Sequence, residues 1–410
     1  MINDDKYFEK EFYSYIEQIE ENQESFELIL DGIERKVFDE INENNVFEIL
    51  EKVNTNIFSL ILKKHIYKEL QDSNWISFSL TNKETEYPIN LYGSVFFDEE
   101  PEQLFIENIK PIRINGKEKI YSMEIFKEAS RSTIVKTLDK DIPHDVVVYN
   151  VGQGNCNGII NSSGHPSFYF DFGGGVFQNT KTYPGKYLNP GRIKFCYTDN
   201  PTVVLSHWDW DHMSSVWKNE HKDIKKSFWI VPKQQIGISH LKVAVDLYNR
   251  GKLLVWPNKL KFLNTNNFQI QKIDDHNKKD KNNNGLVLTV NINSKKDDSI
   301  LLPADANYNL IKKRIGYIGL IATHHGASTH NCLNKLPRAK KPKNKIAYSF
   351  GVRNSFHHPK SISITSHIKK GWDSMYFTFN GHISLVDNII KTMPCIKNSC
   401  RTNCTLSNSQ

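Results

Sequence analysis

Cysteine is scarce in this sequence, with six residues in a chain of 410. They are Cys156, Cys196, Cys332, Cys395, Cys400 and Cys404. A disulfide scaffold normally uses closely spaced, paired cysteines in a short secreted chain, so this scattered set excludes that class and fits a reducing compartment. The last three have the spacing C-x4-C-x3-C, but a structural zinc site takes four ligands in tighter pairs. We therefore expect free thiols there.

Long apolar runs are also missing. No segment approaches the roughly 20 consecutive apolar residues that a membrane-spanning helix requires. The first residues, MINDDKYFEKEFYSYIEQIEEN, are acidic and lack the basic head and apolar stretch of a signal peptide. We therefore expect no membrane partner and a cytoplasmic location.

Positive charge is nearly absent from the first part of the chain. Residues 1–60 hold 16 acidic and 5 basic residues, a net charge of −11, whereas the remainder holds 30 acidic and 48 basic residues, a net charge of +18. A basic body attracts polyanions such as nucleic acid. The alternative is a general abundance of lysine without a polyanionic partner.

The length of the chain predicts two domains. Residues 1–72 are predicted to be helical, because apolar residues such as Tyr13 and Ile16 recur near helical spacing. Alternating stretches from Trp75 onward predict strands. Residues 1–135 are therefore predicted to form a helical, then mixed α+β, N-terminal domain of unknown function. This acidic region could pack on the basic domain, bind a protein partner or mimic nucleic acid, and packing is the simplest interpretation.

The second predicted domain covers residues 140–392 and is followed by a polar tail, 393–410. Its apolar stretches end in short polar loops, which is typical of a layered α/β architecture with a site at the strand ends. The predicted strands are 146–149, 168–170, 202–206, 285–292, 299–302, 318–322, 346–350 and 375–379.

A string of candidate metal ligands follows the predicted strand 202–206. His207, Asp209, Asp211 and His212 are imidazoles and carboxylates, which are ligands for Zn²⁺ or Mn²⁺. His207 and Asp209 are two positions apart, so an extended segment points both side chains the same way. A polar turn without a metal is the alternative interpretation of this string taken alone.

Further candidates follow other predicted strands. Asp305 ends Leu-Leu-Pro-Ala-Asp, the pair His324-His325 follows 318–322, and Asp171 opens a glycine-rich turn. Asp or His at four strand ends is difficult to produce by chance. The pattern therefore favours a metal centre.

These residues resemble the metallo-β-lactamase superfamily, in particular the branch that includes the soluble hydrolase domain of the DNA-uptake channel protein ComEC. The similar segments lie in the same order over roughly residues 144–390. They are Val151-Gly152-Gln153-Gly154-Asn155, Asp171-Phe172-Gly173, Ser206-His207 through His212, Leu302-Pro303-Ala304-Asp305, His324-His325-Gly326, and Ser349-Phe350-Gly351 through His358-Pro359. The resemblance implies an αββα sandwich with two divalent metal ions, Zn²⁺ or Mn²⁺, at one edge.

The resemblance also implies roles for individual residues. His207 and Asp209 would serve the first metal, Asp211 and His212 the second, and Asp305 would bridge the two. One histidine of the pair His324-His325 would complete the second site, and the sequence leaves open which. Asp171 would support the ligand loop by hydrogen bonding.

The sequence departs from the pattern of this branch at several positions. Asn150 and Asn155 stand where the branch commonly has Asp. The additional histidine that many members supply is not evident, since His240 and His276 are both expected to be surface residues. We therefore expect the first metal site to be weak or empty.

The resulting functional hypothesis is metal-dependent hydrolysis of phosphodiester bonds in DNA or RNA. Asp211 and His358 are the predicted catalytic residues, and His358 could instead be a loop residue before a proline turn. The predicted substrate-binding residues are Lys312, Lys313, Arg314, Asn354 and His358. The alternatives are hydrolysis of a small ester, amide or cyclic phosphate, and a non-catalytic binding protein that retains the fold. Oligomeric state is left open.

Overall fold

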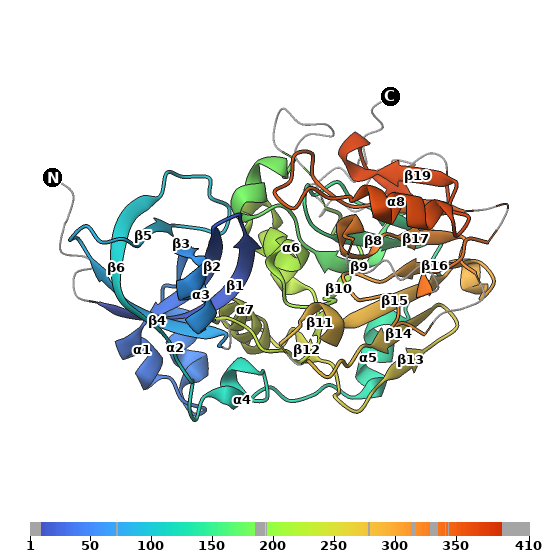
Figure 1. Ribbon diagram of the computed structural model, residues 1–410. Helices are drawn as coiled ribbons and strands as arrows, with labels where there is room; N and C mark the ends of the chain where they lie inside the picture. Colours follow the sequence, from blue (N-terminus) through green and yellow to red (C-terminus); the bar gives the residue numbers. More distant parts are fainter. Residues whose placement is uncertain are drawn as a thin grey trace. The chain divides into compact units, whose positions relative to one another are not determined.

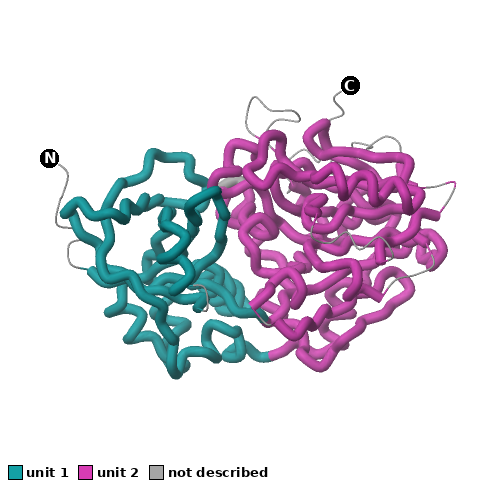
Figure 2. The backbone as a smooth tube through the Cα atoms, viewed as in Figure 1, with its two compact units in different colours: residues 1–127, 234–251 teal, residues 128–233, 252–410 magenta. Residues whose placement is uncertain are grey.

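The computed structural model describes residues 10–70, 73–184, 193, 195–277, 279–312, 316–328, 335–340, 342 and 344–387. The chain divides into two compact units, shown in different colours in Figure 2. The first unit comprises residues 1–127 and 234–251, and the second comprises residues 128–233 and 252–410. The first unit thus ends before the predicted boundary at residue 135 and regains a later segment of the chain.

A closed six-stranded barrel forms the first unit, with strand order β1-β2-β3-β5-β6-β4 (Figure 1). The strands are β1 (Glu11–Glu21), β2 (Ser25–Glu34), β3 (Asn56–Lys63), β4 (Trp75–Thr81), β5 (Pro88–Tyr92) and β6 (Glu102–Pro111). The helices are α1 (Arg35–Glu40), α2 (Val46–Lys52), α3 (Lys64–Leu70), α4 (Glu118–Tyr121) and α7 (Ile238–Asn249). The interior is apolar, with Phe12, Leu28, Phe58 and Phe78 fully buried.

The prediction of a helical region over residues 1–72 is wrong, because this stretch supplies three barrel strands. The physical reason is burial on both faces of the strands. In β2 the six consecutive residues from Leu28 to Ile33 are all buried. A strand covered on both sides loses the alternation of apolar and polar residues, and its apolar run is then easily mistaken for one face of a helix.

The segment 234–251 joins the first unit through buried polar contacts. Asp31 accepts hydrogen bonds from the backbone N–H of Ser239 (2.6 Å) and its hydroxyl (2.7 Å), at the start of α7. Glu17 pairs with Nδ1 of His240 at 3.0 Å. His240 is fully buried, so the expectation that it lies on the surface is wrong, whereas His276 is exposed as expected.

The second unit contains two seven-stranded sheets. The first has the order β12-β11-β10-β9-β8-β7-β20, in which β9 to β12 run parallel. Its strands are β7 (Asp145–Val148), β8 (Cys156–Ile160), β9 (Pro166–Phe172), β10 (Thr202–Val204), β11 (Trp229–Val231), β12 (Leu253–Val255) and β20 (Ile383–Ser384).

The other sheet has the order β13-β14-β15-β16-β17-β18-β19, in which β16 to β19 run parallel. Its strands are β13 (Phe262–Asn264), β14 (Phe268–Lys272), β15 (Leu286–Asn291), β16 (Ser299–Leu302), β17 (Gly319–Ile321), β18 (Lys345–Tyr348) and β19 (Ser374–Phe377). The eight strands predicted for this domain all correspond to observed strands, with ends shifted by a few residues.

The two sheets share one hydrophobic core. Phe168 of β9 packs edge-on against Phe268 of β14, with ring centroids 5.9 Å apart, and Val204 and Leu288 belong to the same cluster. A second cluster on the other face of the second sheet includes Leu320 and Ile346, with Ile364 of α8 (Ser361–Ile368) packed against it. The unit is therefore a mixed α/β structure, which confirms the predicted α/β fold class.

The remaining helices are short. They are α5 (Arg131–Leu138) and α6 (Trp210–Met213), with 3₁₀ segments at Phe177–Thr182, Ser214–Trp217, Asn219–Lys226, Asn282–Asn284, Ile292–Ser294, Thr323–Gly326 and Thr378–Asn380. Within the described ranges, none of the helices combines the length and the apolar character needed to cross a bilayer.

Candidate metal centre

Parallel strands bring the candidate ligands together. Asp171 lies at the end of β9 and His207 follows β10, while Asp305 follows β16 and His324 follows β17. Because β9 pairs with β10, and β16 with β17, in parallel, each pair of strands presents its carboxyl ends at one edge of its sheet. The chain thus places two groups of polar side chains at strand ends of the second unit.

Asp171 organises the loop that carries the histidines. Its carboxylate accepts hydrogen bonds from the backbone N–H of Ser206 (2.7 Å) and the Ser206 hydroxyl (2.9 Å). It also lies 2.9 Å from Nδ1 of His212, and both side chains are fully buried. A carboxylate at Nδ1 keeps the proton there and leaves the lone pair on Nε2. Asp171 therefore orients His212 with Nε2 directed at the cluster.

His325 is oriented by a comparable contact. Its Nδ1 donates to the backbone carbonyl of Ser349, the residue after β18, at 2.7 Å. Its Nε2 lies 3.0 Å from Asp211 and 3.9 Å from Asp305. His324 is more exposed, at 29% of its side chain, and its Nε2 is 3.7 Å from Asp305. Of the two histidines, His325 has the geometry of a buried ligand.

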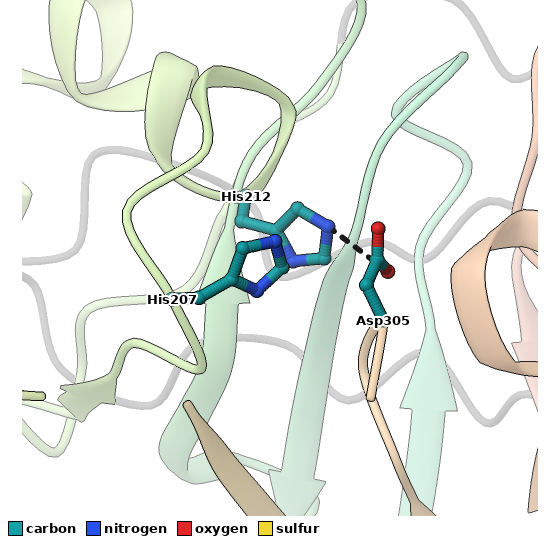
Figure 3. A group of neighbouring side chains, drawn as sticks. All are labelled: His207, His212 and Asp305. Carbon is teal, nitrogen blue, oxygen red and sulfur yellow. Dashed lines mark ion pairs between the residues drawn. The ribbon is translucent and has the colours of Figure 1, made fainter. Parts of the chain in front are cut away.

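The side chains converge on two overlapping groups. One comprises His207, His212 and Asp305, and the other comprises Asp211, His212 and His325. Figure 3 shows the two imidazoles of the first group facing the carboxylate, with Nε2 of His212 3.2 Å from Asp305. Each group offers three nitrogen or oxygen atoms within 4.8 Å of one another, which suits a divalent ion.

The buried atoms of these groups lack ordinary hydrogen bonds. Among the described residues, Nε2 of His207, His212 and His325 and one oxygen of Asp305 make no hydrogen bond of good geometry, although each of these nitrogens lies 3.0–3.3 Å from a carboxylate oxygen. A buried polar atom without a partner normally costs about 1–3 kcal/mol. Lone pairs of imidazoles and a carboxylate that face one another at 3–4 Å would be satisfied by a shared cation, so the residues present fit a metal ion.

The electrostatics of the cluster also favour a cation. Burial opposes charge on His212, but Asp305, Asp171 and Asp211 raise its pKa well above the usual value. The histidines in turn hold the pKa of Asp305 far below its usual value, again against the effect of burial. The negative field that draws a proton to His212 would equally attract a metal ion.

Glycine-rich turns fix the backbone of Asp211. Its carbonyl accepts hydrogen bonds from the N–H groups of Asn155 (3.0 Å) and Gly174 (3.1 Å). A Cβ on Gly173 would lie 1.8 Å from that carbonyl oxygen, so only glycine permits this approach. The Val-Gly-Gln-Gly-Asn and Asp-Phe-Gly-Gly segments therefore position Asp211. Asn155 performs this task through its backbone, which does not require an Asp side chain.

Asp209 lies beside a lysine that the sequence analysis missed. One carboxylate oxygen is 2.8 Å from Nζ of Lys281, and the other is 3.3 Å from Nε2 of His207. Burial would raise the pKa of Asp209, but Lys281 and His207 hold it well below its usual value. Lys281 precedes the run Asn282-Asn283-Asn284 and follows Lys278 and Lys279. One of several lysines in a polar loop carries no signal that distinguishes it from a surface residue.

His358 lies at the cluster, whereas Asn354 supports its loop. The His358 ring is stacked 6.1 Å from that of His325, and burial, followed by His325 and His324, lowers its pKa to about 3. Asn354 is buried, accepts from the N–H of His358 at 2.9 Å and donates to carbonyls of Gly351 and His358. Asn354 therefore supports the loop that carries His358, and its contact with substrate stays a prediction.

Of the three predicted basic substrate-binding residues, only Lys312 lies within the described part of the chain. Lys312 is exposed and its ammonium lies over the Phe262 ring at 5.5 Å, on the edge strand β13. Lys313 and Arg314 lie outside the described residues, as does the tail 393–410. The structure therefore brings together the predicted metal ligands and His358.

Compared with protein-family models and with curated proteins, the chain has no match among either.

Proposed function

We propose that the second unit is a metal-dependent hydrolase that cleaves phosphodiester bonds in nucleic acid. One observation carries the proposal, namely the convergence of the buried side chains of His207, His212, His325 and Asp305 with Asp211, in which the Nε2 atoms make no hydrogen bond of good geometry. Two β-sheets with a shared core and a site at their strand ends are also what the resemblance to metallo-β-lactamases implies. Hydrolysis is the chemistry that such a cluster supports best.

The side chains of the site would have two roles, metal binding and orientation of the imidazoles. His212, His325, Asp211 and Asp305, with His207 beside them, would hold divalent ions such as Zn²⁺ or Mn²⁺. Bound there, divalent ions lower the pKa of water and offset negative charge on a phosphate. Asp171 and the Ser349 carbonyl keep the imidazoles in the required tautomer.

His358 would contact the substrate. With its pKa lowered to about 3, it is neutral near pH 7 and can donate one hydrogen bond to a phosphate oxygen, but it is a poor general acid. The buried Trp208 and Trp210 flank Asp209 and help to exclude water. Nucleic acid is the proposed substrate because residues 61–410 carry a net charge of +18.

The test uses the full chain. Bound metal would be measured by elemental analysis, and labelled single-stranded DNA, duplex DNA and RNA would be incubated with Mn²⁺ or Zn²⁺. We expect cleavage that disappears in Asp211→Ala and His212→Ala and persists in His276→Ala, a histidine exposed outside the cluster. Bound metal without nucleic-acid cleavage would redirect the proposal to a small ester or cyclic phosphate. A wild-type chain without metal would refute it.

A further inference from the structure

Lys281 places a fixed positive charge inside the candidate metal centre. It lies between β14 and β15, and only 10% of its side chain is exposed. Its ammonium is 2.8 Å from Asp209 and donates to the backbone carbonyl of Trp208 at 3.2 Å. Both contacts are to residues of the His207–His212 string, so the lysine belongs to the site.

The two oxygens of Asp209 have different neighbours. Oδ1 faces Lys281, while Oδ2 faces His207 at 3.3 Å. A divalent ion bound by Asp209 would share this one carboxylate, whose side chain is 29% exposed, with the ammonium, and two cations on a single carboxylate repel each other. Asp209 is accordingly the one acidic residue of the string that is in neither of the two convergent groups.

The geometry of His212 also limits the number of ions. Both groups of convergent ligands depend on His212. Its Nδ1 is engaged by Asp171, so Nε2 has one lone pair and can bind one ion. In the group with Asp211, the Ser349 carbonyl orients His325, and Asp305 lies within 3.9 Å of both His212 and His325.

We infer that the ammonium of Lys281 replaces one of the two divalent ions. One ion would be held tightly by Asp211, His212, Asp305 and His325, while Lys281 neutralises Asp209 and prevents tight binding of a second ion at His207. This inference rests on the proposed function, because it assumes a metal at the site.

The experiment measures metal stoichiometry and not activity. Wild-type protein and Lys281→Met would be dialysed against Mn²⁺, bound metal would be counted per chain, and the electron paramagnetic resonance spectrum would be inspected for coupling between neighbouring Mn²⁺ ions. Lys233→Met is the matched control, because Lys233 pairs with Glu128 at 3.0 Å and 13% of its side chain is exposed, but it lies outside the cluster. Lys281→Arg keeps the charge.

We expect one tightly bound, uncoupled ion in the wild type, Lys233→Met and Lys281→Arg, and a second, coupled ion in Lys281→Met with an affinity gain of about tenfold or more. Two tight ions in the wild type, or one ion in both the wild type and Lys281→Met, would overturn the inference while leaving the proposed hydrolase intact. Absence of metal from the wild type would overturn both.

A second variant keeps the test decisive if Lys281→Met does not fold. The double variant Lys281→Met, Asp209→Asn removes both members of the ion pair and so leaves no uncompensated charge beside the ion. If the tight ion is held on the Asp211 side, its affinity should change by less than about threefold, well short of the 10- to 100-fold that loss of a supporting contact costs. A loss of tenfold or more would make Asp209 a ligand of that ion and contradict the inference.

Discussion

At the scale of single residues, the centre depends on side chains that fix the direction of its imidazoles. Asp171 holds Nδ1 of His212, and the Ser349 carbonyl holds Nδ1 of His325. If Asp171 or the Ser349 carbonyl bound an ion through the oxygen that contacts the histidine, that histidine would lose its orienting contact. The orientation of the candidate ligands is therefore fixed by residues that contact them and do not themselves face the ion.

Replacement of Asp171 by Asn tests this arrangement. The amide would present an N–H to either His212 or Ser206, both of which donate to Asp171. The proton of His212 would then no longer be held on Nδ1. We expect metal affinity to fall by about 10- to 100-fold, measured by competition with a chromophoric chelator. Asp199→Asn is the control, because Asp199 pairs with His165 at 3.3 Å outside the cluster. Equal affinity in Asp171→Asn and the wild type would argue against an orienting role.

At the scale of elements, the glycine turns determine where Asp211 lies. Gly173→Ala would force a methyl group against the Asp211 carbonyl, which lies 1.8 Å from the position of that Cβ. We expect weaker metal binding and a loss of about 1–3 kcal/mol of unfolding free energy, measured by urea titration. Gly93→Ala, where the nearest atom is 3.5 Å from the added Cβ, should change neither.

A buried histidine connects α8 to the second sheet. His367 bonds the hydroxyls of Tyr308 (3.1 Å) and Tyr348 (2.9 Å), and the Tyr308 hydroxyl accepts from the N–H of Thr323, next to His324. Burial lowers the pKa of His367 to about 4. The neutral imidazole is thus part of the folded state.

Acid should therefore weaken the second unit. Between pH 6.5 and pH 4 the unfolded chain binds a proton at His367 that the folded chain does not, so the free energy of unfolding falls as pH falls, by at most roughly 3 kcal/mol from this group. Urea titrations at pH 7 and pH 4.5 should show the loss. His367→Phe should be less stable at pH 7 and should depend less on pH. An unchanged pH dependence in that variant would exclude His367 as a source.

The strands of the second unit could be predicted from the sequence, whereas the barrel and the position of Lys281 could not. Strands such as β16 and β18 can be recognised in the sequence as short apolar runs that end in polar loops, and the candidate ligands can be recognised because they follow such strands. The barrel cannot be recognised in this way, because β2 is buried on both faces and loses its alternation. Lys281 was missed because its significance comes from Asp209, more than 70 residues earlier in the chain, and only the fold brings the two together.

At the scale of the whole molecule, charge is the property that points to a partner. Residues 1–60 have a net charge of −11 and the rest of the chain +18. If nucleic acid binds the basic part, its affinity should decrease steeply between about 50 and 200 mM salt, because each neutralised phosphate releases counterions. Fluorescence anisotropy with the inactive Asp211→Ala variant would measure this. Affinity independent of salt would count against a nucleic-acid substrate.

The return of residues 234–251 to the first unit has a consequence for the order of events during translation. Asp31 and Glu17 are buried, and their partners Ser239 and His240 lie on α7. When only the first 127 residues have emerged from the ribosome, α7 has not yet been synthesised and these carboxylates lack their hydrogen-bond partners. The barrel can therefore reach its final state only after most of the first sheet of the second unit has also been synthesised, and a gene fragment that stops at Lys127 should yield an aggregation-prone polypeptide.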